Sequence, residues 1–180
     1  PRPKRRIRPE PTRPTTSGMT FPTLAITLTD EDATRVLAQA LAQNPSLADA
    51  TLSLRGDLGA GKTTFTRHLL RALGAQGRIK SPTYALLEPY EDLPAPWGRL
   101  SAWHFDFYRL QDPNEYEEAG LAEVFATPGL KIVEWLEQVA EHAPAVDLSL
   151  DLSILDDGQR QARLQAHSAC GAALIKGLHT

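Results

Sequence analysis

Hydrophobic and polar positions change their spacing several times along this chain, and each change predicts a different element. Residues 24–28 and 51–54 have the length and alternation of short strands. Apolar residues recur at helical spacing over residues 33–41 and again over residues 65–73. The polar pair Thr29-Asp30 precedes the first of these helices and is suited to capping it. The first part of the chain therefore predicts strand, helix, strand and helix.

The middle of the chain predicts two strands joined by exposed connections. Residues 77–84 contain Pro82, which disfavours helix at the residue before it, so this segment should be extended and exposed. Residues 85–88 are a strand candidate. Residues 91–98 hold two prolines and a glycine and predict a turn of variable length. Residues 100–108 form an apolar run with an acid near its end, which indicates a second strand.

The last third predicts further strands and a closing helix. Short helical pieces are expected over residues 114–125, and a strand is expected over residues 130–135. Residues 147–152 and 161–167 alternate on either side of an Asp-Asp-Gly turn, a pattern typical of a hairpin. Residues 172–178 predict a final short helix. Since strands and helices alternate early and hairpins come late, we predict an α/β three-layer sandwich. Its mixed central sheet should be parallel in the middle and antiparallel toward one edge.

Composition limits this fold to one domain. A chain of 180 residues with 42% hydrophobic content can build one well-packed core and hardly two. Its single cysteine, Cys170, cannot form an intramolecular disulfide, which suits the reducing cytoplasm where we expect the protein to act. No apolar run is long enough for a membrane span, so no membrane association is expected. We assign the folded domain to residues 20–180.

Residues 1–19 differ from the rest in charge and composition. Residues 1–18 hold six lysines and arginines against one glutamate, a net +5, so the other 162 residues carry −8 of the total of −3. Five prolines and almost no large apolar residues predict a disordered arm. The arm could contact RNA phosphates, or it could be an incidental extension ahead of Met19, a plausible alternative start. We favour the extension, and the folded part does not have the charge of a dedicated nucleic-acid binder.

One motif points to chemistry. Residues 56–63 read Gly-Asp-Leu-Gly-Ala-Gly-Lys-Thr, a complete phosphate-binding loop of the form G-x4-G-K-T between a predicted strand and a predicted helix. In such a loop the backbone N–H groups and the helix N-terminus face one anion. Lys62 would reach the β and γ phosphates of a nucleotide, and the Thr63 hydroxyl would hold Mg²⁺. The alternative is a tight turn with Lys62 as a solvated surface lysine. For Asp57, a role in tuning water and a role in the turn are equally open.

Two acids stand at the ends of predicted strands. In an open α/β sheet ligands bind at the carboxyl ends of the parallel strands, and Mg²⁺ prefers oxygen ligands. We expect Asp106 to act near the metal or its water, with a helix cap or a salt bridge as the alternative. Glu134 could bind the metal or orient the attacking water. The five histidines show no metal-ligand spacing, and a lone histidine is more often a surface or packing residue.

Four motifs, in order and with similar spacing, carry a resemblance to a known family. They are residues 56–65, then Lys-Ser-Pro-Thr-Tyr at 80–84, His-Phe-Asp-Phe-Tyr-Arg-Leu at 104–110 and Val-Glu-Trp at 133–135. Together they resemble TsaE, formerly YjeE, the small bacterial ATPases of tRNA threonylcarbamoyladenosine biosynthesis. The resemblance covers residues 24–178. It implies a P-loop NTPase-like fold for the predicted sandwich.

The resemblance also implies site residues. ATP phosphates would be wrapped by the loop and the start of its helix: Leu58, Gly59, Ala60, Gly61, Lys62, Thr63 and Thr64. Thr63, Glu134 and Asp106 would serve Mg²⁺, and Lys62, Asp106 and Glu134 would serve catalysis. Ser81, Thr83 and Tyr84 would belong to a switch loop. Trp135 would lie close to the nucleotide, and Glu31 and Arg160 align less securely with positions near the adenosine.

Partners are implied as well. In the family, TsaE binds the TsaB–TsaD pair, in which TsaD transfers threonylcarbamoyl to adenosine 37 of ANN-decoding tRNAs. ATP hydrolysis, weak without partners, would keep that machine cycling, so tRNA would be contacted only through the complex. Residues 1–18 and the proline-rich turn at 91–98 depart from the family pattern. A small-molecule kinase and a non-hydrolytic nucleotide-gated adaptor are the competing hypotheses, although no arginine-bearing lid insertion is visible for a kinase.

Overall fold

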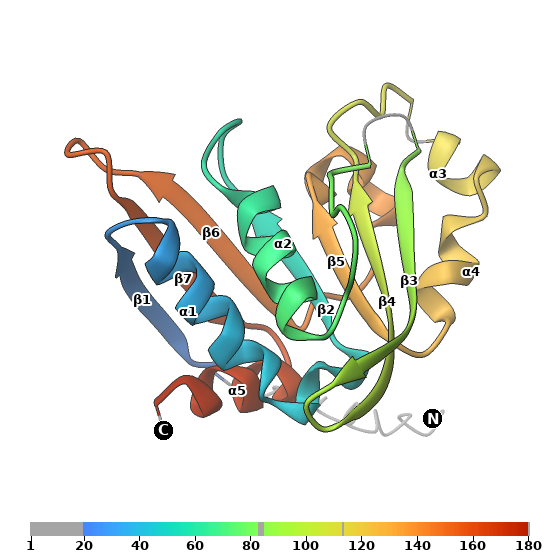
Figure 1. Cartoon of the computed structure of the whole chain (residues 1–180). Helices are drawn as coiled ribbons and strands as arrows, with labels where there is room; N and C mark the ends of the chain where they lie inside the picture. Colours follow the sequence, from blue (N-terminus) through green and yellow to red (C-terminus); the bar gives the residue numbers. More distant parts are fainter. Residues whose placement is uncertain (1–19, 83–84, 113, 180) are drawn as a thin grey trace, which may run out of the picture.

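A single seven-stranded mixed sheet forms the centre of the molecule, with the strand order β1-β7-β6-β2-β5-β4-β3 (Figure 1). The computed structural model describes residues 20–82, 85–112 and 114–179. The predicted disordered arm at 1–19 lies outside the described residues. The strands are β1 (Thr23–Leu28), β2 (Thr51–Arg55), β3 (Leu87–Ala95), β4 (Gly98–Asp106), β5 (Leu130–Glu134), β6 (Leu148–Ile154) and β7 (Arg160–Ala166).

Five α-helices and three short 3-10 helices in the described residues connect these strands. The α-helices are α1 (Glu31–Ala42), α2 (Lys62–Ala72), α3 (Asn114–Glu118), α4 (Leu121–Ala126) and α5 (Ala169–Lys176). The 3-10 helices are η1 (Pro45–Asp49), η2 (Leu136–His142) and η3 (Gly177–His179). The predicted cap is confirmed, because the Asp30 side chain accepts a hydrogen bond of 2.8 Å from Ala33 N at the start of α1.

The sheet is parallel in its centre and antiparallel at both edges. β2 runs parallel to β5 and β6, and β4 runs parallel to β5. β3 pairs antiparallel with β4 at one edge, and β7 pairs antiparallel with β6 and β1 at the other. The prediction of one antiparallel edge was therefore incomplete, because β3 pairs antiparallel with β4 at the second edge. The carboxyl ends of the parallel strands β2, β4 and β5 meet at one end of the sheet.

The prediction of a turn over residues 91–98 was wrong. β3 begins at Leu87 and continues to Ala95, and only Pro96 and Trp97 form the turn into β4. Prolines are tolerated because β3 is an edge strand, which need not donate every backbone N–H. A register shift between Tyr90 and Leu93, with Asp92 at a φ of 53°, bends the strand as a β-bulge does.

Two apolar clusters hold helices against the two faces of the sheet. The larger cluster joins α1, α2 and α5 to one face, and Phe65, Leu69 and Leu70 of α2 are fully buried in it. The smaller cluster places α3, α4 and η2 over the other face of β4 and β5. Its aromatic rings pack directly, with the centroids of Phe105 and Phe125 4.4 Å apart. The molecule is thus a three-layer sandwich whose α2 starts at the carboxyl end of β2.

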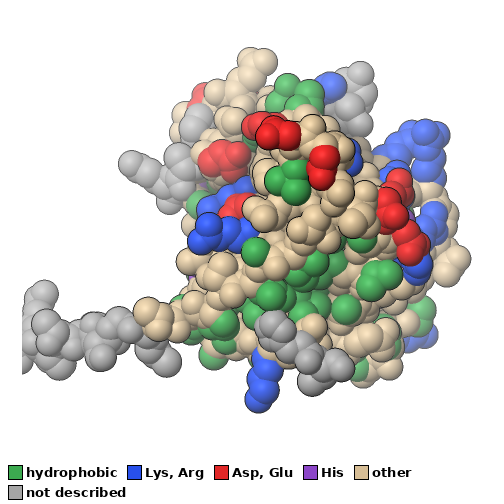
Figure 2. All heavy atoms as spheres, turned by 90° about the vertical axis from the view of Figure 1, so that its left-hand side faces the viewer, with side chains coloured by type: hydrophobic (Ala, Val, Ile, Leu, Met, Phe, Trp, Pro, Cys, Tyr) green, Lys and Arg blue, Asp and Glu red, His purple; other side chains and the backbone are tan. Residues whose placement is uncertain are grey.

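The lengths of the helices and the distribution of surface charge bear on membrane and nucleic-acid partners. No helix within the described ranges has the length and apolar character needed to cross a bilayer. Figure 2 looks toward the β1 edge and shows acidic and basic side chains close to one another rather than a continuous basic field. On the described part of that face, side chains of both charges are mixed, whereas a nucleic-acid binding surface usually gathers basic side chains.

Candidate nucleotide-binding site

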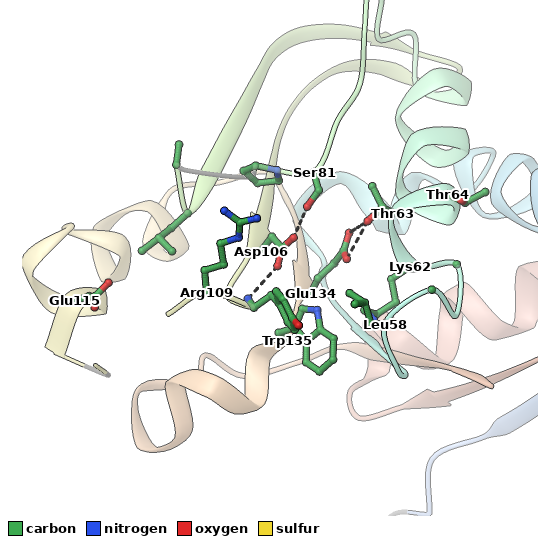
Figure 3. A pocket seen from close by; sticks show the side chains of 16 residues that line it. Leu58, Lys62, Thr63, Thr64, Ser81, Asp106, Arg109, Glu115, Glu134 and Trp135 are labelled. Carbon is green, nitrogen blue, oxygen red and sulfur yellow. Dashed lines mark hydrogen bonds between the residues drawn. The ribbon is translucent and has the colours of Figure 1, made fainter. Parts of the chain in front are cut away.

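A cavity of about 810 Å³ opens at the carboxyl ends of β2, β4 and β5 (Figure 3). Its size is within the range of about 300–1,000 Å³ that small-molecule sites occupy. The cavity is lined by Leu58, Gly59, Gly61, Lys62, Thr63, Thr64, Ser81, Pro82, Ala85, Leu86, Asp106, Tyr108, Arg109, Glu115, Glu134 and Trp135. The structure thus brings together most of the residues that the sequence motifs singled out.

The loop between β2 and α2 needs its glycines for geometric reasons. Gly56 has a φ of 134°, and a Cβ atom there would lie 2.2 Å from the carbonyl oxygen of Leu152. Gly61, immediately before α2, has a φ of 109°. A side chain at either position would strain the backbone or collide with it. The loop closes on itself through a 3.0 Å hydrogen bond from Ala60 N to Asp57 O, and Ala60 is buried beneath it.

Lys62 points into the loop and is not a solvated surface lysine. Its residue is only 5% exposed, and its Nζ donates to Gly56 O at 2.6 Å and to Asp57 O at 3.0 Å. The ammonium group also lies 4.3 Å from the centroid of the Trp135 ring. Burial lowers the pKa of Lys62 below its usual value, and the neighbouring acids, chiefly Glu134 and Asp106, oppose this shift. The surface-lysine alternative is therefore contradicted.

Thr63, the next residue, joins the start of α2 to the end of β5. Its hydroxyl lies 3.1 Å from Oε1 and 3.2 Å from Oε2 of Glu134. The same Oε1 lies 2.9 Å from Nε2 of His104, and the side chains of His104 and Glu134 are 0% and 3% exposed. The two residues predicted to serve a metal are therefore already in contact, with a buried histidine behind them.

Asp106 ends β4 directly beside Glu134, because the two residues are register partners across β4 and β5. Its Oδ1 accepts a 3.0 Å hydrogen bond from Tyr108 N, and its Oδ2 accepts one from the Ser81 hydroxyl. The carboxylate therefore links the end of the sheet to the segment predicted as a switch loop. Thr83 and Tyr84 of that segment lie outside the described residues.

The remaining predicted residues differ in how close they come to the cavity. Trp135 lines it with a φ of 59°, and its ring lies 5.0 Å from that of Tyr108. Glu31 does not line it and instead pairs with His68 of α2, with 3.0 Å between Oε1 and Nε2. Arg160 does not line it either, although its Nε would lie 3.7 Å from a Cβ atom on Gly61.

Three residues of the site were missed by sequence reasoning. His104 was treated as a packing residue, yet it contacts Glu134. The signal available was its position two residues before Asp106, which places both on the same face of a strand. Arg109 and Glu115 line the cavity from the segment after β4. Arg109 belongs to the motif at 104–110, but no role was assigned to it, and no local pattern marks Glu115. The place of both depends on how this segment folds back over the sheet.

Comparison with known proteins adds the family to this geometry. A family model described as "Threonylcarbamoyl adenosine biosynthesis protein TsaE" matches residues 28–163 of this chain. The chain belongs to the TsaE family. The resemblance stated from four motifs is thereby confirmed. The TsaE family is described as acting in threonylcarbamoyl adenosine biosynthesis, and membership ties the chain to that process.

Individual relatives agree with the TsaE family model. The chain is 41% identical over 122 residues to the tRNA threonylcarbamoyladenosine biosynthesis protein TsaE of Haemophilus influenzae, covering 68% of this chain and 73% of that protein. It is 34% identical over 143 residues to TsaE of Rickettsia felis, covering 79% and 80% of the two chains. The crystal structure of Bacillus subtilis YdiB matches with a TM-score of 0.70 and 26% identity, covering 90% of this chain and 97% of that one. These matches confirm the predicted α/β fold.

Proposed function

We propose that this chain binds ATP with Mg²⁺ and hydrolyses it, as the ATPase subunit that keeps the TsaB–TsaD complex cycling during modification of adenosine 37 in ANN-decoding tRNAs. The observation that carries the proposal is the contact of the Thr63 hydroxyl with both carboxylate oxygens of Glu134. That contact sets a hydroxyl at the start of α2 and a carboxylate at the end of β5 on the same side of one cavity, beside the phosphate-binding loop.

The loop fits a polyphosphate. Gly59 has a φ of 83° and open space where a Cβ would stand, so its backbone can approach a ligand closely. α2 spans 11 residues, enough for a helix dipole whose positive end faces the cavity. Lys62 now donates to two loop carbonyls and would turn its ammonium toward the β and γ phosphates. A buried lysine with a lowered pKa gains an anionic partner when phosphates bind, which favours its charged form.

The oxygen donors fit Mg²⁺ when phosphate and water complete the shell. In the part of the chain that the structure describes, no group of three or more His, Cys, Asp and Glu side chains is placed to hold a metal ion. Mg²⁺ usually keeps several waters and takes one or two carboxylates plus substrate phosphates. Thr63 and Glu134 would hold the metal, and Asp106 would hold one of its waters. Bound there, Mg²⁺ neutralises charge that develops on the transferring phosphoryl group.

The opposite side of the cavity supports control by partners. The Ser81 segment and Arg109 line it, and the Ser81 hydroxyl donates to Asp106. Leu58 and Tyr108, at the same cavity, are 70% and 48% exposed, unusual for large apolar side chains. A partner that covers these side chains would also press the segment around Ser81 against Asp106 and Glu134. We therefore propose slow hydrolysis by the chain alone and faster hydrolysis in the TsaB–TsaD complex.

The test is a steady-state ATPase assay of the purified chain, alone and with TsaB–TsaD, together with multiple-turnover tRNA modification. We expect a slow rate alone, a clear rise with partners, and modification that stops after few turnovers when the chain is omitted. Thr63→Ala should lose both the basal and the stimulated rate. If partners do not stimulate hydrolysis and modification does not depend on this chain, the proposal is wrong.

A small-molecule kinase is the second candidate, and one observation favours it. Arg109 and Glu115, from the segment between β4 and β5, form a wall of the cavity on the side away from α2. A charged wall of this kind can position a phosphoryl acceptor. A screen of hydroxyl and phosphate acceptors with γ-labelled ATP separates the two functions, since a kinase transfers label to one acceptor class and an ATPase releases inorganic phosphate.

A further inference from the structure

A histidine lies in the apolar layer between β4 and α2. His104 is fully buried, and its neighbours along the same face of β4, Leu100 and Ala102, belong to the larger apolar cluster. Burying an imidazole in such a layer costs free energy unless its nitrogen atoms are hydrogen-bonded. A phenylalanine or a leucine would therefore suit this position better if it served packing alone.

Among the described residues, the His104 ring makes one hydrogen bond, and that bond goes to Glu134. Nε2 of His104 lies 2.9 Å from Oε1 of Glu134. A carboxylate that binds a metal is ionised and only accepts hydrogen bonds, so in that role of Glu134 the donor would be Nε2. The other ring nitrogen, Nδ1, is buried and has no hydrogen-bond partner among the described residues. Such incompletely satisfied buried polar groups call for an explanation, and a role in a functional site is a common one.

The geometry of the strands explains how the ring reaches this carboxylate. His104 on β4 stands opposite Ile132 on β5, and Asp106 stands opposite Glu134. The His104 ring therefore contacts a residue of β5 that lies two positions beyond its own register partner. Oε1 of Glu134 is thus held from inside the molecule by His104 and from α2 by the Thr63 hydroxyl. Glutamate has three side-chain torsions, and two contacts from different elements fix the plane of its carboxylate.

We propose that His104 is a positioning residue, which holds the Glu134 carboxylate in the orientation that Mg²⁺ and the attacking water require. The inference rests on the function proposed above. His104 is absent from the residues that line the cavity, so it acts through Glu134 and touches neither metal nor nucleotide. Partners that orient a metal ligand in this way typically contribute about 10–100-fold to metal affinity or activity.

Two substitutions separate positioning from packing. His104→Phe keeps a ring of similar size and removes the donor, whereas His104→Gln places an amide N–H near the position of Nε2. We expect His104→Phe to lower kcat for ATP by about 10–100-fold with little change in KM, and to raise the Mg²⁺ concentration needed for half-saturation of ADP binding by a similar factor. Trp135 lines the cavity, so its fluorescence is expected to change on ADP binding and to follow that binding without turnover. His104→Gln should recover part of both losses, and thermal unfolding should leave His104→Phe at least as stable as wild type.

Each other outcome overturns the inference. Wild-type kcat and wild-type Mg²⁺ dependence in His104→Phe would remove the positioning role. A parallel loss of stability and of metal-free ADP binding in both variants would make His104 a structural residue. In a Glu134→Gln background, His104→Phe should change kcat no further, and an additive loss would show that the two residues act separately. Wild-type protein that binds no ADP would overturn the proposed function too, whereas failure at His104 alone leaves that function standing.

Discussion

The two walls of the cavity differ in construction (Figure 3). The first wall is formed by the loop, α2 and the end of β5, and its charged groups are buried: Lys62 is 5% exposed and the Glu134 side chain 3%. The second wall is formed by Ser81 and Pro82, from the connection between α2 and β3, and by Arg109 and Glu115, from the connection between β4 and β5. A buried wall supplies fixed binding geometry, and a wall of connecting segments can be rearranged by a partner. We expect the first wall to set affinity and chemistry and the second to set stimulation.

The largest expected effect tests the first wall at Lys62. Lys62→Ala removes the charge that would face the β and γ phosphates, and a lost charge-assisted contact costs about 1.5–3 kcal/mol, or roughly 10–100-fold in ATP affinity. Hydrolysis should fall below detection. Calorimetric titration and phosphate release measure the two quantities. Lys176→Ala, which removes an exposed lysine from the last turn of α5, is the matched control and should behave as wild type. Wild-type affinity in Lys62→Ala would remove this residue from the site.

The next effect separates chemistry from binding within the same wall. Glu134→Gln keeps the shape of the side chain and removes the charge that would serve metal and water, so hydrolysis should fall by about 100-fold or more. Affinity for ATP measured in EDTA should change much less, because the loop and Lys62 remain. Glu123→Gln, on the exposed face of α4, controls for the loss of one carboxylate. Equal losses in metal-free binding and in hydrolysis would contradict a metal role for Glu134.

The comparison between the walls is tested most sharply at Arg109. Arg109→Ala removes a cation from the second wall, and a cation that meets the transferring phosphate can contribute about 10³ or more. Because Arg109 is exposed, we expect a smaller loss in the chain alone and a loss of about tenfold in the rate stimulated by TsaB–TsaD. Arg99→Ala, at the far end of β4, is the control. An equal loss of hydrolysis rate with and without TsaB–TsaD would contradict the assignment of stimulation to the second wall.

Much of the first wall could be predicted from the sequence, because its determinants are local. The loop motif stands between one strand and one helix, and Glu134 ends an apolar run, as does Asp106 on the neighbouring strand β4. The second wall could not be predicted in the same way. Arg109 and Glu115 reach the cavity only because the segment between β4 and β5 folds over the sheet. The spacing of His104 and Asp106 places both on one face of a strand, but the contact of His104 with Glu134 also required the register of β4 with β5.

In the fold, too, the elements with local determinants could be predicted and the long-range pairings could not. Helix α1 with its cap at Asp30 follows from local pattern, and so does the hairpin of β6 and β7. The late pairing of β1 with β7 joins residues more than a hundred positions apart and has no local signal. The length of β3 was missed for a different reason. Its prolines predicted a turn, and only the position of the strand at the sheet edge makes them compatible with pairing.

The smallest expected effect concerns pH. Because burial lowers the pKa of Lys62 below 10.5, the unfolded chain holds this proton more tightly than the folded chain between the lowered pKa and 10.5. Across that window the free energy of unfolding of the nucleotide-free protein should therefore gain a rising contribution with pH. Lys62→Met should flatten the rise. Urea unfolding of both proteins at several pH values up to 10 measures this, and identical pH dependence in the two would contradict a buried, charged lysine.

The central claim is that one cavity binds ATP and Mg²⁺ together through the first wall. Calorimetric titration of ATP into the purified chain, with and without Mg²⁺, tests it most directly. The account predicts one site per chain, measurable binding in EDTA through the loop and Lys62, and tighter binding with Mg²⁺ than in EDTA. In Thr63→Ala, Mg²⁺ should no longer tighten the binding of ATP. Absence of binding in both conditions, or binding that neither Mg²⁺ nor Thr63→Ala alters, would contradict it.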